Sequence, residues 1–382
     1  MRPLFIHIGL HKTGTSFLQR LLYENRAALA AAGLGLAPYQ DPRSGSHHPI
    51  LAAIEAEGPQ AVFDTVAAAP GARLLISAEE ISQEMNRRPG YLASLHAAAA
   101  RHFEPHVVIF LRRQDFLKES VYAEAVKGWF SGAIADDHHY DYDHEARLAR
   151  LEAVFGRARV HVALYRDPGP NDIVGDLLAA TGTVLDQGLL RPVPRQNVSM
   201  ARRKTLLLGQ TTKPEDAADD QAARVAPHFV ARVLAGSAAV ADDGERFLLS
   251  PAERHALVAA HAAGNRAIVE RYGLAGPEAG SDPFLALPDP DAPWTPPAPI
   301  SAAEARAVRR ACLASALRSR RRNPVAVLRL ATQIARLLAP VPRGPAPRPA
   351  AASVENPGRR GYDGPVVAEG ERGAHVEALR RK

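Results

Sequence analysis

The residues from Gly9 to Ser16 combine the side-chain types that bind a phosphate or sulfate group. This segment, Gly-Leu-His-Lys-Thr-Gly-Thr-Ser, holds one lysine and three hydroxyl side chains. Lysine supplies a mobile positive charge, and the hydroxyls of Thr13, Thr15 and Ser16 supply hydrogen-bond donors. The segment therefore has the composition of an anion-binding loop.

The sequence on either side predicts the elements that position this loop. An apolar run from Leu4 to Ile8 is short enough for a buried parallel strand, and apolar residues return with helical spacing at Phe17, Leu18, Leu21 and Leu22. The first backbone N–H groups of a helix have no intrahelical acceptor and lie at the positive end of its dipole. A strand, loop and helix in this order form a site for an anion. We expect the helix over about 15–32 and an irregular stretch over 33–49 after it.

The order of lysine and glycine distinguishes this loop from a nucleoside-triphosphate P-loop. In that motif, G-x-x-x-x-G-K-[ST], the lysine follows the second glycine, whereas Lys12 precedes Gly14 here. The order resembles the 5′-phosphosulfate loop of sulfotransferases that use 3′-phosphoadenosine-5′-phosphosulfate (PAPS). The resemblance implies a catalytic Lys12 and a cofactor-binding loop made of His11, Lys12, Thr13, Gly14, Thr15 and Ser16. The plain alternative is a Gly/Thr turn before an amphipathic helix.

A pair of residues later in the sequence has the spacing of a second phosphate-binding motif. Arg112 ends the apolar run Val107 to Leu111, and Ser120 follows eight residues later on a predicted helix. In PAPS-dependent sulfotransferases an arginine and a serine at this spacing hold the 3′-phosphate, which implies that role for Arg112 and Ser120. A guanidinium suits phosphate oxygens because its N–H groups form a planar fork. Without the first motif, a surface arginine with a solvent-facing serine would explain the pair equally well.

Candidates for a general base follow a further apolar run, Arg73 to Ser77. Glu79 and Glu80 come directly after it, and ligand chemistry in a doubly wound sheet collects at the carboxyl ends of strands. A charged helix N-terminus would explain the same pair. Relatives use Glu or His as the base; we choose Glu79, then Glu80, with the pair His47 and His48 as the rival. Each histidine could instead be a loop or buried residue that only makes structural hydrogen bonds.

Later segments support the same resemblance. Tyr165-Arg166-Asp167 ends a predicted strand where the family usually has Tyr-Glu-Asp, and Arg271-Tyr272-Gly273 resembles the end of its last helix. Asn197 and Ser199 belong to an Asn-x-Ser segment that the resemblance places at the cofactor. Ser199 is also a predicted N-cap for a helix that carries Arg202, Arg203 and Lys204.

The whole-chain properties restrict the class of protein. The chain has 382 residues, 46% of them hydrophobic, a net charge of +6 and one cysteine, Cys312. A disulfide framework and a cysteine-based metal site are therefore excluded, and a reducing cytoplasm is favoured. No apolar run reaches the length of a membrane span, and a strand begins too early for a signal peptide. We expect no metal and no nucleic acid partner.

These patterns predict an α/β protein with a P-loop-type three-layer fold, in which helices flank a parallel sheet of about four to five strands. We expect a sulfotransferase-like domain at 1–275, a Pro-rich linker at 276–300, a basic amphipathic helical extension at 301–339 and a disordered tail at 340–382. The extension could contact the inner face of a membrane peripherally, although a solvated helix face is as good an explanation.

The predicted function is sulfuryl transfer from PAPS to a hydroxyl or amine of a carbohydrate, lipid or small molecule, as in related bacterial enzymes. The sequence leaves the acceptor and the oligomeric state open. A P-loop kinase is one alternative, but it would require a lysine after the second glycine and an acidic Mg²⁺ ligand. A non-catalytic protein that binds membranes or acidic glycans through the basic extension is the other.

Overall fold

The computed structural model describes residues 1–167, 171–194, 200–211, 221–274, 282–318 and 324–338. Its centre is a five-stranded, all-parallel sheet with the strand order β2-β3-β1-β4-β5. The strands are β1 (Arg2–His7), β2 (Leu34–Leu36), β3 (Arg73–Ser77), β4 (Phe103–Arg112) and β5 (Val160–Tyr165). The strand order reverses at β1, and such a switch point is where open α/β sheets bind ligands. The predicted fold class is confirmed.

Alternating side chains bury both faces of the sheet. On β4, Val107 and Ile109 join one hydrophobic cluster, while Val108 and Phe110 join another on the opposite face. Successive side chains of a strand point to opposite faces, so a continuous apolar run produces a strand that is buried on both sides. This explains why the sequences of the central strands are unbroken runs of apolar residues.

Helices cover each face of the sheet, which gives the fold three layers. One face packs against α3 (Pro49–Ala67), α5 (Tyr91–Ala99) and α7 (His144–Phe155), with α11 (Pro251–Tyr272) lying over α7. The other face packs against α1 (Thr15–Glu24), α2 (Arg26–Ala31) and α8 (Ile173–Ala180). Short elements complete this part: α4 (Ile81–Arg87), η1 (Ile134–Asp136), η2 (Arg157–Arg159) and η3 (Gln187–Leu189).

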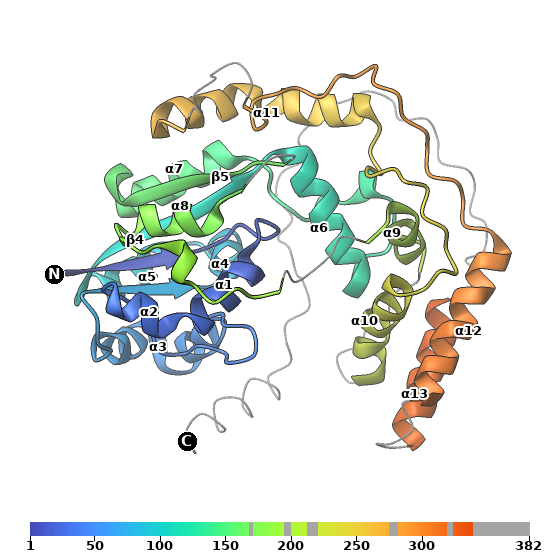
Figure 1. The fold of residues 1–382 in the computed structure, drawn as a ribbon, viewed down its shortest axis with the longest axis horizontal. Coiled ribbons are helices and arrows are strands. Elements are labelled where there is room, and N and C mark those ends of the chain that lie inside the picture. The colour runs from blue at the N-terminus through green and yellow to red at the C-terminus, as the bar shows by residue number, and fades with distance from the viewer. Residues whose placement is uncertain (168–170, 195–199, 212–220, 275–281, 319–323, 339–382) are drawn as a thin grey trace.

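A third hydrophobic cluster lies beyond the carboxyl ends of the strands. It joins α6 (Gln114–Gly128) and α9 (Arg202–Gly209) to α10 (Gln221–Ala235), α12 (Ala302–Arg318) and α13 (Pro324–Leu337), on the right of Figure 1. Val126, Leu208, Val230, Cys312 and Ile334 are buried within it. Two helices from the predicted C-terminal extension therefore share a core with helices that precede residue 275.

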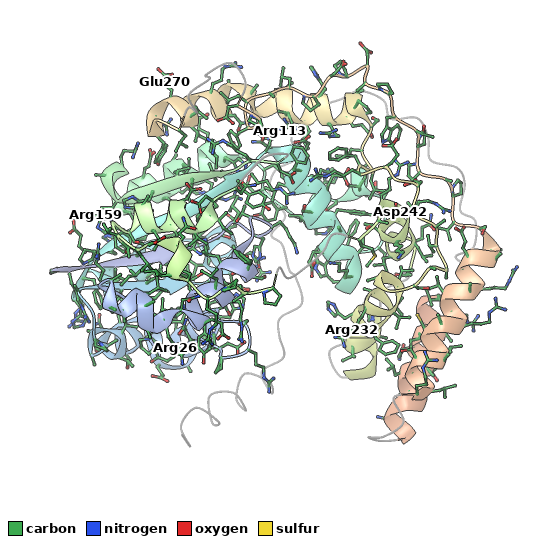
Figure 2. The ribbon with its side chains drawn as sticks, viewed as in Figure 1. Arg26, Arg113, Arg159, Arg232, Asp242 and Glu270 are labelled. Atoms are coloured by element: carbon green, nitrogen blue, oxygen red, sulfur yellow. The ribbon has the colours of Figure 1, made fainter. Side chains whose placement is uncertain are left out.

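Arginines fasten the segment that leads to α12 onto the rest of the chain. Arg113, which Figure 2 labels beside the start of α6 and beneath α11, donates to the carbonyl oxygens of Pro283 and Ala286, each across 2.8 Å. Arg203 on α9 pairs with Glu304 at the start of α12. These bonds make residues 282–300 an extended wrap along the helices.

Several local predictions were wrong in detail. The helix expected over residues 15–32 is two helices, because Asn25 ends α1 and its side chain donates to the carbonyl oxygens of Leu21 and Arg191. The expected irregular stretch after it contains β2. The helix near residue 200 begins at Arg202 with Ala201 in the N-cap position, so Ser199 is not its N-cap. Among the described residues, no helix combines the length and apolarity that a bilayer span requires.

Candidate functional site

Four neighbouring strands end at one cavity of about 430 Å³. Lys12 follows β1, Glu79 follows β3, Arg112 ends β4 and Asp167 follows β5, and all four side chains line the cavity. Residues of α1 and α6, including Thr15, Ser16 and Ser120, complete the same wall. The parallel sheet thus brings together residues that are more than 150 positions apart in the sequence.

Glycines shape the loop after β1. Gly9 has φ +93°, and a Cβ at this position would lie 2.9 Å from Glu79 Cβ. Gly14 has φ +81°, and its Cβ would lie 2.9 Å from Ile173 Cδ1. Only glycine adopts such backbone angles without strain and leaves room for these neighbours. Both positions allow the loop to pack closely between β3 and α8.

The side chains of the loop divide into two groups. Thr13 is buried, and its hydroxyl donates to the carbonyl oxygen of Leu10 across 2.7 Å. It therefore fastens the loop, and only its backbone N–H is left for an anion. His11, Lys12, Gly14, Thr15 and Ser16 all line the cavity. Since Thr15 and Ser16 begin α1, their N–H groups are among those without an intrahelical acceptor.

Arg112 connects the two predicted phosphate-binding motifs. Its Nη1 donates to the carbonyl oxygen of Lys12 across 2.8 Å and to Ser120 Oγ across 2.7 Å. Its Nη2 pairs with Asp167, and its guanidinium lies 5.3 Å from the centroid of the Tyr165 ring. Among the described residues, Arg112 Nε is buried without a hydrogen-bond partner. The guanidinium is thus held in place at the edge of the cavity with one donor to spare.

Lys12 is paired with a residue of α6. Its Nζ lies 2.9 Å from Glu124 Oε2, and Lys127 Nζ lies 2.9 Å from the same oxygen. Burial lowers the pKa of Lys12, and the neighbouring Glu124 carboxylate opposes that shift. Despite its own burial, Glu124 has a pKa lowered to about 2 by the two ammonium groups. The Glu124 carboxylate is therefore ionised at neutral pH.

Glu79 lies on the other side of the loop as a buried carboxylate with several donors. Gln19 Nε2 and Thr15 Oγ1 donate to it, and His48 Nε2 lies 3.2 Å from its Oε2. Burial alone would raise the pKa of Glu79, but hydrogen bonding to His48 and its positive charge hold the pKa well below the usual range. Glu79 is therefore ionised throughout the neutral range.

His48 lies between two carboxylates. It contacts Glu80 as well as Glu79, and together they outweigh burial and raise the pKa of His48 to about 10. Each of the three residues offers one ligand atom, and these atoms lie within 4.8 Å of one another. An imidazole and two carboxylates at this spacing are also a donor set for a divalent cation. At neutral pH without a cation, His48 carries the charge and cannot accept a proton.

The other histidines differ in their surroundings. His47 is buried: its Nδ1 accepts from the Ser77 N–H across 3.1 Å, so its Nε2 donates to the carbonyl oxygen of Ala37 across 3.0 Å. Burial lowers the pKa of His47 to about 4. Its contacts are those of a structural histidine and give no support to a role as base. His11 lines the cavity beside Gln83, and burial lowers its pKa as well.

Sequence reasoning missed several charged residues of the cavity, among them Glu124, Lys127, Asp167 and Arg246. Glu124 and Lys127 follow Ser120 by four and seven residues on α6, so helical spacing from Ser120 could have indicated them. Asp167 was recognised only as part of the Tyr165-Arg166-Asp167 segment and not as a site residue. Arg246 had no local signal, because it reaches the cavity from an irregular segment.

The position of Arg246 depends on a buried carboxylate of α6. Glu119 accepts the backbone N–H groups of Leu248 and Leu249 across 2.9 and 2.8 Å. Burial raises the pKa of Glu119 to about 7. Arg202 lines the cavity too, but its guanidinium is bonded to Asp243, Phe247 and Thr295. Asn197 and Ser199 lie outside the described residues.

Comparison with known proteins gives one structural match. No protein-family profile and no curated protein matches the sequence. A solved structure described as a sulfotransferase from Alicyclobacillus acidocaldarius is 17% identical, and the match covers 60% of this chain and 94% of that one with a TM-score of 0.32. A match this weak supports no statement about activity, so the function is argued from the cavity.

Proposed function

We propose that this protein is a sulfotransferase that moves a sulfuryl group from PAPS to a hydroxyl or amine of an acceptor. The observation that carries this proposal is the double hydrogen bond of Arg112 Nη1, to the carbonyl oxygen of Lys12 and to Ser120 Oγ. It places the loop that resembles a 5′-phosphosulfate site against the pair that resembles a 3′-phosphate site. One ligand with anionic groups at both ends could therefore contact both.

The cavity has the donors that such a ligand would require. Arg112, with its spare Nε, and Ser120 are suited to the 3′-phosphate, and Arg246 adds a second guanidinium nearby. Ser16 offers its hydroxyl, and Thr15 and Ser16 offer free helix-start N–H groups, to the 5′-phosphosulfate. Between the charged groups the wall is apolar, with Phe17, Phe116 and Phe247. Aromatic rings of this kind suit a purine base.

Lys12 has the main electrostatic role. Sulfuryl transfer resembles phosphoryl transfer in that negative charge grows on the leaving phosphate, and a positioned cation stabilises it. Lys12 lines the cavity at the start of the loop, where its ammonium group can reach that oxygen. The residues that line the cavity also hold the phosphosulfate and the attacking group of the acceptor molecule in line. This alignment by itself lowers the activation barrier substantially.

Glu79 is our choice for the group that receives the acceptor's proton. It is an ionised carboxylate in the cavity wall, next to Thr15 of the loop. A low pKa makes Glu79 a weak base, so it acts by accepting the proton as the S–O bond forms. His11 is a second candidate, because its lowered pKa keeps the imidazole neutral and it lines the same cavity. The charged His48 serves to hold Glu79 in its ionised form.

The test is binding followed by turnover. Thermal-shift titration and calorimetry with PAP, the desulfated nucleotide, should reveal stabilisation that ATP with Mg²⁺ does not match. Transfer of ³⁵S from labelled PAPS to panels of carbohydrate, lipid and phenol acceptors should then identify the acceptor class. Stabilisation by ATP with Mg²⁺ alone would favour the P-loop kinase alternative and refute our proposal.

A further inference from the structure

Each pair of cations in the cavity is joined by a carboxylate of the protein itself. Glu124 Oε2 lies 2.9 Å from both Lys12 Nζ and Lys127 Nζ. Asp167 receives Arg246 Nη2 at 2.8 and 2.6 Å and also pairs with Arg112 Nη2. All six side chains line the same cavity. The two carboxylates thus divide its cationic wall into two separate groups.

These carboxylates use the same donors that a phosphate or sulfate would use. Two ammonium groups that meet at one carboxylate oxygen would serve an oxygen of a sulfate equally well. A guanidinium fork accepts a carboxylate or a phosphate in the same bidentate way. An anion that enters either group must therefore compete with a protein carboxylate for its cations. Like charges that remained side by side would repel each other.

The exposure of its side chain indicates how Glu124 could move away from the two lysines when an anion binds. Its side chain is 48% exposed, so it can turn into solvent and be hydrated there. Lys12 and Lys127 are more covered, at 27% and 26%, and stay in the wall. Asp167 is only 15% exposed. The exchange is therefore easier at Glu124 than at Asp167.

We propose that Glu124 and Asp167 are competing counter-ions that determine which ligands the cavity accepts. A ligand can bind both pairs of cations only if it carries two anionic groups. One would bind Lys12 and Lys127, and the other would bind Arg112 and Arg246. A single phosphate or sulfate displaces at most one carboxylate and binds weakly. This inference deepens the proposed function, because PAPS carries two such groups, but it concerns anions in general. It adds Lys127 and Arg246 to the binding residues.

The proposal makes a prediction that a positioning role does not. Glu124→Gln removes the competing charge and leaves the side-chain shape, so affinity for an anion should rise about three- to tenfold. The same change leaves Lys12 and Lys127 without their counter-ion, so the melting temperature without added ligand should fall. If Glu124 only positioned Lys12, both quantities would fall together.

The experiment compares wild type, Glu124→Gln, Asp167→Asn and the control Glu104→Gln by calorimetry and thermal melting. Glu104 forms an exposed ion pair with Arg159 outside the cavity, so its variant should match wild type in binding. The probes are inorganic pyrophosphate, which needs no nucleoside site, and PAP. We expect Glu124→Gln to bind both probes more tightly than wild type. Asp167→Asn should do the same if it folds, and Glu124→Gln decides the question if it does not.

The outcomes separate this proposal from the proposed function. Tighter pyrophosphate binding by Glu124→Gln, with no PAP binding by any variant, would support the competing counter-ions and refute the sulfotransferase. If Glu124→Gln binds PAP no more tightly than wild type does, the counter-ion proposal is refuted, but the sulfotransferase proposal is not. Failure of both wild type and Glu124→Gln to bind either probe would overturn both proposals.

Discussion

Arg112 Nη1 and Ser120 Oγ lie 2.7 Å apart, which joins the end of β4 to the second turn of α6. The hydroxyl therefore fixes the direction of the guanidinium, and the pair works as one unit at the edge of the cavity. Removing the serine should weaken ligand binding less than removing the arginine.

Arg112→Ala should reduce affinity for PAP by about 100-fold or more, and Ser120→Ala by about tenfold. A hydrogen bond to a charged group contributes about 1.5–3 kcal/mol, and the arginine loses several at once. Calorimetry measures both affinities. Melting temperatures must accompany them, because Arg112 also holds the carbonyl oxygen of Lys12. Equal affinities in wild type and Arg112→Ala would remove the 3′-phosphate assignment.

Lys12→Ala should abolish measurable PAPS-dependent transfer, a loss in kcat of about 100-fold or more. Arg and Lys are not equivalent at such a position, so Lys12→Arg should recover only part of the rate. Single-turnover assays with labelled PAPS separate the chemical step from binding. A Lys12→Ala protein with unchanged kcat would show that the leaving oxygen is stabilised elsewhere.

Glu79→Gln should lower kcat and leave PAP affinity nearly unchanged, because our proposal has Glu79 receive the acceptor's proton and gives it no contact with the nucleotide. Since the pKa of Glu79 is held low, the wild-type rate should stay level as the pH falls from 8 toward 5. A rate that declines over this range would show that Glu79 is not the base. Turnover that survives in Glu79→Gln but is lost in His48→Ala would place the base at His48.

His48 should make the stability of the protein depend on pH in the alkaline range. The folded pKa of His48 is raised to about 10 from its ordinary 6.5 by the two carboxylates that outweigh burial. The native state then binds the proton more tightly than the unfolded chain. Its stabilising contribution is complete below about pH 6.5 and is lost as the pH rises to about 10. Melting temperatures of wild type should fall across this interval more steeply than those of His48→Gln.

The exposed face of α12 should bind anionic membranes if the sequence prediction about the extension is right. Arg306, Arg310 and Leu317 recur at helical spacing, with Arg306 and Arg310 exposed and Leu317 47% exposed, while Val308 and Cys312 are buried behind them. Arg306→Glu with Arg310→Glu should abolish co-sedimentation with phosphatidylglycerol vesicles and leave PAP binding intact. Binding of an acidic glycan without vesicle binding would instead favour the other basic-surface alternative.

Point substitutions are the proper test of that face, because α12 and α13 are part of a core. Val308 and Cys312 pack with Val230 of α10, so removing residues after 300 would expose this cluster. A deletion would therefore confuse loss of a binding face with loss of folding.

The sequence predicted the parts of the site that lie in consecutive residues. The loop around Lys12, the spacing of Arg112 and Ser120, and the carboxylates after β3 were readable because strand, turn and helix signals are local. The hydrophobic periodicity did not reveal β2, which has only three residues. It also predicted one helix where α1 and α2 are separated at Asn25. A tertiary hydrogen bond from Asn25 to the carbonyl oxygen of Arg191 accompanies that break and has no local signal.

The pairings of side chains across the cavity could not be predicted from the sequence for a similar reason. That Glu124 faces Lys12 and that Arg246 faces Asp167 depends on how α6 and an irregular segment meet the sheet. His47 and His48 are adjacent in the sequence, yet one makes two backbone hydrogen bonds inside the protein and the other contacts two carboxylates. Only the packing of β3 against the preceding loop separates their roles.

The absence of a side chain at Gly9 links the two halves of the chemistry. Because a Cβ there would approach Glu79 Cβ to 2.9 Å, the loop after β1 and the carboxylate that we propose as the base share one point of contact. Neither half can be redesigned alone: a bulkier residue 9 displaces the group at 79, and a shifted strand end displaces the loop. A change of acceptor preference by mutation is therefore more accessible at the rim of the cavity than at its centre.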